Sequence, residues 1–134
     1  MDTAVRIRPA IEIEPALHQE LLTQADEQGQ IIIHFRYLSA TGISGDKIRI
    51  WPSTYIESLD DEQKTQLAHA EHIALMPEWT VVRSGAHDFT LIFPGLASSV
   101  TAFRMIEYCD SAGAPFQIPR IERCESDVYF VMFS

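Results

Sequence analysis

The sequence predicts an all-β protein: a mainly antiparallel two-sheet sandwich of seven to nine short strands with one or two short helices. Short apolar segments with a period of two residues recur along the chain, which is typical of strands with one buried face. Gly, Pro and clusters of polar residues separate these segments at regular intervals. A chain of 134 residues is long enough for a core of its own, so we expect a single β-sandwich domain over residues 1–134.

The clearest strand signal lies in residues 88–103, around which the rest of the chain is organised. Apolar side chains occupy every second position of its first half: Phe89, Leu91 and Phe93. Pro94 lacks a backbone N–H and Gly95 permits a sharp turn, so this strand is expected to end there. A second apolar strand is expected from Thr101.

The first third of the chain predicts two further strands and one helix. Residues 5–13 alternate apolar and charged side chains, which indicates a strand with one charged face and a break at Pro9. Residues 15–29 place their leucines on one helical face between Pro15 and Gly29, which predicts a short surface helix, with an irregular excursion as the alternative. Residues 31–37 and 47–51 alternate again and predict a hairpin with a long loop.

The remaining segments complete the predicted sheets. Residues 58–66 are polar and predict a loop or a single helical turn, and residues 73–82 predict an extended segment interrupted at Pro77. Strands are expected over residues 101–108, 116–121 and 128–133. The last of these is apolar on both faces, so it is expected to be covered or internal.

The charge of the chain restricts its partners. Ten Lys and Arg against nineteen Asp and Glu give a net charge of −9, which argues against nucleic acid and against anionic membrane surfaces. No apolar run is long enough for membrane insertion, and residues 1–30 show no signal peptide. The expected location is therefore cytoplasmic, or periplasmic or cell-envelope if a leader has been removed.

The cysteines give no metal or redox motif. Cys109 and Cys124 are too few for a zinc site and too far apart for a Cys-x-x-Cys pair. They flank a predicted antiparallel pair of strands, so a disulfide is the minority interpretation and two free thiols the main one.

Four stretches, at residues 48–56, 70–79, 84–96 and 101–107, together resemble a known family. Their order is I-x-I-x-P-S-T-Y-I, then A-E-x-I-x-L-x-P-E-W, then S-G-x-x-x-F-T-L-I-F-P-x-L, then T-x-F-x-x-I-E. This is similar to bacterial immunoglobulin-like β-sandwich modules, which occur alone or ahead of thioredoxin-like reductase domains in envelope proteins. The resemblance covers about residues 31–121.

The resemblance implies an immunoglobulin-like sandwich that acts as a non-catalytic binding or protein-interaction module without a cofactor. Reductase activity does not transfer, because the chain has no Cys-x-x-Cys motif, and residues 16–29 look like an insertion. A shared fold does not by itself fix a function.

Three aromatic residues, Trp51, Tyr55 and Trp79, are the candidate contacts for a ligand or partner. Trp51 is out of phase with its apolar neighbours and is expected to face outward, where aromatic rings stack on sugars or anchor a protein. The partner is thus an unknown protein, small molecule or glycan. The alternatives are that these rings belong to the core, or that the exposed face forms a homodimer interface.

A metal-binding protein or enzyme is the alternative class. His69, Glu71 and His72 are the most metal-like group, with His87 as a further candidate, because imidazole and carboxylate groups are common ligands. The spacing differs from His-Glu-x-x-His, so a solvated loop is favoured over a metal site.

Overall fold

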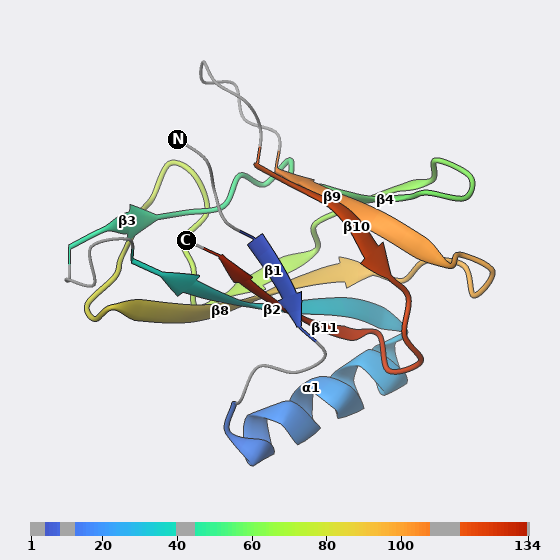
Figure 1. Ribbon diagram of the computed structural model, residues 1–134, viewed down its shortest axis with the longest axis horizontal. Helices are drawn as coiled ribbons and strands as arrows, with labels where there is room; N and C mark the ends of the chain where they lie inside the picture. The colour runs from blue at the N-terminus through green and yellow to red at the C-terminus, as the bar shows by residue number, and fades with distance from the viewer. Residues whose placement is uncertain (1–4, 9–12, 40–44, 108–115, 134) are drawn as a thin grey trace.

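The computed structural model describes residues 5–8, 13–39, 45–107 and 116–133, and two stacked β-sheets dominate it (Figure 1). The first sheet has, in spatial order, β1 (Val5–Arg8), β11 (Val128–Phe133), β2 (Gln30–Leu38), β8 (Ala86–Pro94) and β6 (His69–Glu71). The second has β10 (Phe116–Glu122), β9 (Ala102–Glu107), β4 (Tyr55–Ser58) and β5 (Lys64–Gln66). A separate ribbon pairs β3 (Lys47–Ile48) with β7 (Thr80–Val81).

The all-β, mainly antiparallel prediction is confirmed, although the described residues form eleven strands rather than seven to nine. The excess consists of very short strands of two or three residues, namely β3, β5, β6 and β7. β5 falls in residues 58–66, where a loop or helical turn was predicted. Strands this short carry too few positions for an alternating pattern to be visible.

The predicted hairpin between residues 31–37 and 47–51 is wrong. β2 pairs antiparallel with β8 and parallel with β11, while β3 pairs with β7. Alternation identifies a strand but says nothing about its partner, and every neighbour of β2 is distant in sequence. The pairing of β10 with β9 is antiparallel, as expected.

The main core fills the space between the two sheets. The strand predicted around Phe89 forms as β8, and its side chains Phe89, Leu91 and Phe93 are fully buried. They pack with residues from both sheets in one cluster that also includes Ile33, Ile56, Phe103, Ile118 and Val131. This shared core identifies the two sheets as layers of one sandwich.

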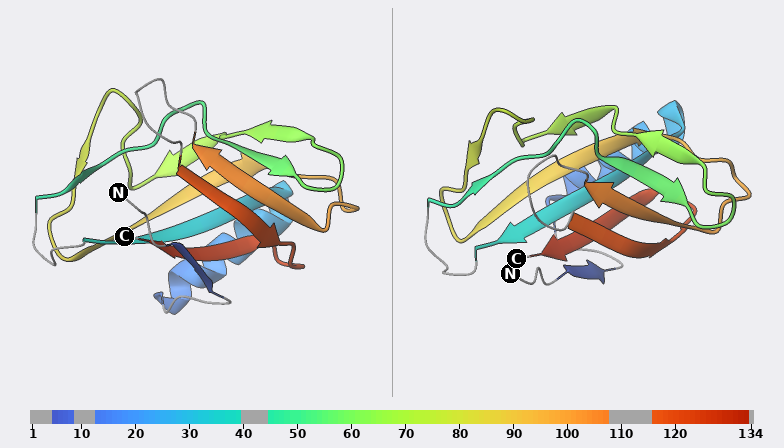
Figure 2. Two further views of the ribbon diagram at one scale, coloured as in Figure 1. Left: turned by 45° about the horizontal axis from the view of Figure 1, so that its top comes forward. Right: turned by 90° about the horizontal axis from the view of Figure 1, so that it is seen from above.

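A second, smaller core lies on the outer face of the first sheet, under helix α1 (Pro15–Gln28) (Figure 2). Leu21 and Ala25 of the helix pack there on Ile92 and Phe130. Both faces of β11 are therefore covered, as its sequence predicted. No helix in the described residues has the length and apolar character needed to cross a membrane.

Two glycines allow the helix to end against the sheet. Gly29 has φ of 62°, a left-handed conformation, and its N–H bonds to the carbonyl of Ala25. At Gly95, a Cβ atom would lie 2.2 Å from the Gly29 carbonyl oxygen, so any side chain is excluded by that close approach. Gly29 and Gly95 thus join the end of α1 to the end of β8.

One end of the sandwich is closed by Arg123, which we call the closed end. Its guanidinium donates two bonds to Asp127, at 2.6 and 3.0 Å, and three to the carbonyls of Leu96, Ala97 and Val100 at 3.0–3.3 Å. Tyr129 donates its hydroxyl to the same carboxylate. One side chain thus joins the β8–β9 and β10–β11 connections.

Candidate binding site

We call the opposite end the open end. The β3–β7 ribbon lies there and belongs to neither sheet (Figures 1 and 2). Beneath the ribbon lies a pocket of about 340 Å³. Residues of β2, β8, β9, β10 and β11 line it from the sandwich side, and Lys47–Ile50, Ile73 and Trp79 from the ribbon side. Its volume falls in the range of small-ligand sites, about 300–1,000 Å³.

Aromatic rings form the inner wall of the pocket. Phe35 and Phe89 stack with ring centroids 4.9 Å apart, and Phe133 meets both edge-on at 5.9 and 6.0 Å. Phe116 adds a further contact with Phe133 at 5.3 Å. The wall follows from the strand period, because Phe35 and Phe89 face each other across the β2–β8 pair. The pocket is thus an extension of the core, and it suits an apolar guest.

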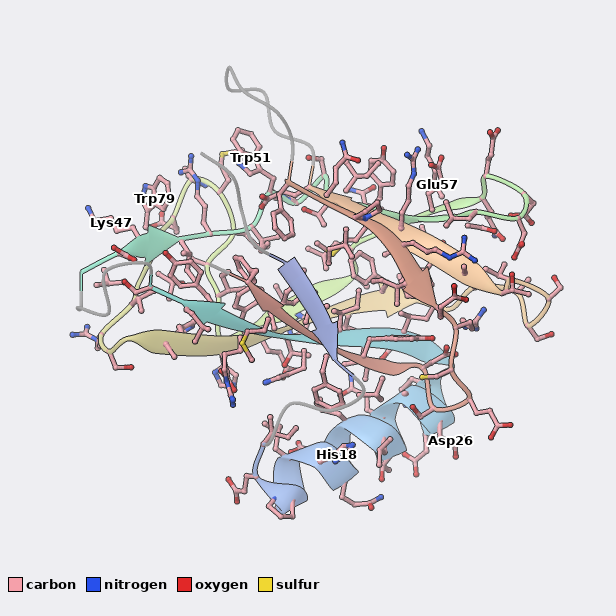
Figure 3. The ribbon with its side chains drawn as sticks, viewed as in Figure 1. His18, Asp26, Lys47, Trp51, Glu57 and Trp79 are labelled. Carbon is pink, nitrogen blue, oxygen red and sulfur yellow. The ribbon has the colours of Figure 1, made fainter. Side chains whose placement is uncertain are left out.

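The rim is built around Arg49. Its guanidinium carbon lies 3.8 Å from the centroid of the Trp79 ring and 5.6 Å from that of Trp51, and it donates a bond of 3.2 Å to the carbonyl of Pro77. Trp79 is 51% exposed. Figure 3 shows Trp51, Trp79 and Lys47 gathered around β3, far from Glu57 toward the other end. The cation–π contact holds a large ring at the mouth of the pocket.

One carboxyl group lies among these apolar residues. Glu107 shares the inward phase of Phe103 and Met105 on β9, so its side chain lines the pocket. Burial raises the pKa of the Glu107 carboxyl, against the lowering effects of the Trp51 N–H, 3.4 Å from Oε2, and of the Arg49 charge. The pocket therefore contains an acid whose charged form is disfavoured.

A second acid near the pocket is already engaged. The hydroxyl of Tyr37, a lining residue, donates to Asp46 at 2.9 Å. Burial, followed by the bond and the charge of Asp46, raises the pKa of Tyr37. The Asp46 carboxylate thus anchors the start of β3 to the end of β2.

The structure brings together two of the three predicted contact residues. Trp51 and Trp79 flank Arg49, while Tyr55 lies apart on the outer face of the second sheet, since its neighbour Ile56 points into the core. The Lys64 ammonium lies 5.1 Å from the Tyr55 ring centroid. Trp51 and Tyr55 are partly buried rather than fully exposed.

The residues of the predicted metal alternative lie on β6 and in the turn after it. His69 Nε2 is 3.6 Å from Glu71 Oε1, whereas His72 adopts a left-handed φ of 64°. His87 contacts the carbonyl of His72, at 2.6 Å, rather than its ring. Across the part of the chain that the structure describes, no group of three or more His, Cys, Asp or Glu could hold a metal ion.

Cys124 is a free, exposed thiol, 3.4 Å from the hydroxyl of Ser126. Cys109 lies outside the described residues, so the predicted choice between free thiols and a disulfide stays a prediction.

A polar network occupies the outer face of the first sheet, beside α1. His34 is 2% exposed; its Nδ1 lies 2.9 Å from Thr90 Oγ1 and its Nε2 3.1 Å from Asp88 Oδ2. Arg36 donates to both oxygens of Asp88, at 2.8 and 3.0 Å. The order hydroxyl, imidazole, carboxylate resembles a catalytic triad, but Thr90 is also only 2% exposed, so its hydroxyl is not accessible to a substrate. The network joins β2 to β8 on this face.

Sequence reasoning missed Arg49 and Glu107. A signal for Glu107 was present, because it follows Phe103 and Met105 at the same strand phase, where an acid is unusual. Arg49 had no comparable signal, since a cation between two apolar strand positions is ordinary on a solvated face.

The chain matches no protein-family model, and comparisons with curated proteins and with solved structures find no match either.

Proposed function

We propose that this protein is a non-catalytic binding module that takes an apolar group of its ligand into the pocket at the open end. Trp51 and Trp79 are the contact residues at the rim, and Tyr55 is not part of the site. The observation that carries the proposal is the pocket of about 340 Å³, with an aromatic inner wall and a half-exposed Trp at its mouth. Pockets with apolar linings and a few polar groups are the usual form of small-ligand sites.

Exposed apolar side chains near the ribbon support the same location. Leu75, Trp79 and Val81, three of the five large apolar residues exposed in the described chain, lie within seven residues of sequence. Singly exposed apolar residues are ordinary, but a concentration beside an apolar pocket is typical of a binding surface. Covering them on binding would add to the free energy of association.

The sheet edges are poor sites for binding another chain by strand addition. The edge strands β5 and β6 have three residues each, β1 has four, and β10 is interrupted at Pro119 by a register shift. Short and bulged edges are how sheets avoid pairing with other chains. A homodimer through an edge is therefore the less favoured form of contact.

The immunoglobulin-like description belongs to this proposal as well. Its support is the stacking of two mainly antiparallel sheets over one core. Helix α1, on the outer face of the first sheet, corresponds to the stretch that looked like an insertion.

The test uses N-phenyl-1-naphthylamine, a neutral apolar fluorophore whose emission rises when it leaves water. We expect saturable binding at one site per chain. Ile73→Trp and Ile48→Trp, which fill the pocket from the ribbon side, should each weaken binding at least tenfold. Leu59→Trp, a matched change at an exposed position toward the other end, should leave binding unchanged.

Thermal midpoints of all three variants show whether they remain folded. Binding that persists unchanged in folded Ile48→Trp and Ile73→Trp proteins would show that the probe binds elsewhere, and the proposal would fall.

A further inference from the structure

The positive charges of the described residues are distributed unevenly between the two ends. Most cations have a carboxylate partner: Arg36 with Asp88, Lys64 and Arg104 with Glu57, Arg120 with Glu122, and Arg123 with Asp127. Among the cations whose side chains the structure describes, three have no carboxylate within ion-pair distance: Lys47, Arg49 and Arg83.

These three cations lie at the open end. Lys47 is in β3, directly opposite Val81 of β7, and Arg83 follows Val81 by two residues beyond the buried Val82. Lys47 and Arg49 line the pocket. Lys47 and Arg83 are exposed, so their charges are available to a ligand. Among the described side chains of a protein with a net charge of −9, the unpaired cations thus lie at the end that holds this apolar pocket.

The nearby acids Asp46 and Glu78 form no ion pair with these three cations, which outnumber them. Asp46 is engaged by the Tyr37 hydroxyl at 2.9 Å, and Glu78 forms no ion pair within 4.0 Å in the described structure. Glu107 lies deeper, where burial disfavours its charged form. Charge beside a low-dielectric wall is screened less than charge in open solvent, so these cations attract an anion at the pocket mouth.

We infer that the ligand is a small amphipathic anion, whose compact apolar part enters the pocket and whose anionic head group lies at the mouth against Lys47, Arg49 and Arg83. This inference rests on the proposed function and adds the chemical class of its ligand. A cavity of about 150 Å³ accommodates one benzene ring, so about 340 Å³ suits one or two rings or a medium-length alkyl chain.

The test compares three probes with the same tail: octanoate, 1-octanol and octylammonium. Both tryptophans of the chain flank Arg49, so intrinsic Trp emission reports on this site alone. We expect octanoate to bind about tenfold more tightly than octanol, and octylammonium more weakly than either. Raising the ionic strength should weaken the binding of octanoate but not that of octanol.

Paired variants identify the charges that are responsible. Lys47→Gln combined with Arg83→Gln should lower the affinity for octanoate about tenfold and leave that for octanol unchanged. Arg120→Gln, an exposed cation outside the pocket lining, is the matched control and should change neither affinity.

Two outcomes would contradict these proposals, one the anionic head group and the other the pocket itself. Equal affinities for the three probes, or tightest binding of octylammonium, would overturn the anionic head group and leave the apolar pocket as a binding site. Failure of all three probes, together with failure of the neutral fluorophore, would overturn the proposed function itself.

Discussion

The two ends of the sandwich use an arginine in opposite ways. At the closed end, Arg123 makes five hydrogen bonds, to Asp127 and three carbonyls. At the open end, Arg49 rests on the Trp79 ring and donates to a single carbonyl, that of Pro77. The first arrangement uses the donors of the guanidinium to join loops, and the second leaves donors without an acceptor among the described residues, beside a pocket.

Under the proposed function, the difference separates stability and recognition in space. A cation with all its donors used contributes to folding but offers nothing to a ligand. A cation with donors to spare contributes little to folding and keeps its charge for a ligand. Substitutions at the two ends should therefore change the free energy of unfolding by different amounts, and in some cases in opposite directions.

The largest effect is expected at Arg123. Arg123→Ala removes two hydrogen bonds from the partly buried Asp127, which keeps that of the Tyr129 hydroxyl, and one from each of three carbonyls. The free energy of unfolding should therefore fall by about 2–4 kcal/mol. Urea unfolding followed by circular dichroism measures it. Arg120→Ala, which removes an exposed ion pair with Glu122, should cost less than about 0.5 kcal/mol. Equal losses in the two variants would contradict the role given to the closed end.

Asp88 tests whether the number of hydrogen bonds, rather than position at an end, decides the effect. Burial opposes its ionisation, but hydrogen bonds from His34 and Arg36 outweigh that effect and hold the pKa of Asp88 well below its ordinary value. Asp88→Asn should lower the free energy of unfolding at pH 7 by about 1–2 kcal/mol, a value reduced for partial exposure.

The pH dependence of the Asp88 contribution follows from its sign. Because the folded-state pKa is depressed, the contribution is fully present above the unfolded-state value near pH 4 and is lost as the pH falls below it. The difference in the free energy of unfolding between wild type and Asp88→Asn should therefore shrink as the pH falls from 5 to 2.5. A constant difference over that range would mean that the ionised carboxylate is not responsible.

Substitution of Glu107 should change the free energy of unfolding in the opposite direction. Burial raises its pKa, so the folded protein loses stability as the pH rises through the interval above the ordinary glutamate value. Glu107→Gln should raise the free energy of unfolding at pH 7 by about 1 kcal/mol, and by less at pH 4. Glu78→Gln, at an exposed position, is the control. Loss of stability at pH 7 in Glu107→Gln would show that the Trp51 N–H and Arg49 outweigh burial.

Apart from the control substitutions, the smallest change in stability is expected at Trp79. Trp79→Ala removes a ring that is 51% exposed and its contact with Arg49, at a cost of about 0.5–1 kcal/mol. Binding of the neutral fluorophore should nevertheless fall several-fold, because the ring covers the pocket mouth. Leu59→Ala, at another exposed apolar position, should leave binding unaffected. A large loss of stability with unchanged binding would make Trp79 a core residue instead.

Much of the fold was predictable because the spacing of apolar residues along a strand shows which of its faces are buried. Phe89, Leu91 and Phe93 predicted β8, and the two apolar faces of residues 128–133 predicted an internal strand. What the pattern lacks is the identity of the partner strand. The parallel pair of β11 with β2 joins Val128 to Ile32, and nothing local in either segment specifies it.

The site was predictable only in part, for a related reason. Trp51 and Trp79 are conspicuous by their size, so both were predicted as contacts. Arg49 acquires its role from lying between them, and that depends on the β3–β7 pairing. Tyr55 was grouped with the tryptophans because it is close to Trp51 in sequence, but its position on β4 directs it to another face.

The two neighbours of β11 also determine how the chain would respond to a pulling force applied at Val5 and Phe133. These residues are opposite each other in the antiparallel β1–β11 pair, so the load falls on one pair of bonds after another and β1 peels away at low force. Helix α1 lies between β1 and β2 in the chain, so it is pulled off the sheet next. The load then passes through β2 from its start and β11 from its end. Because these strands are parallel, their six registered pairs from Val128 to Phe133 are sheared together. Single-molecule stretching should show weak events for β1 and α1 and then a strong one for the β2–β11 pair.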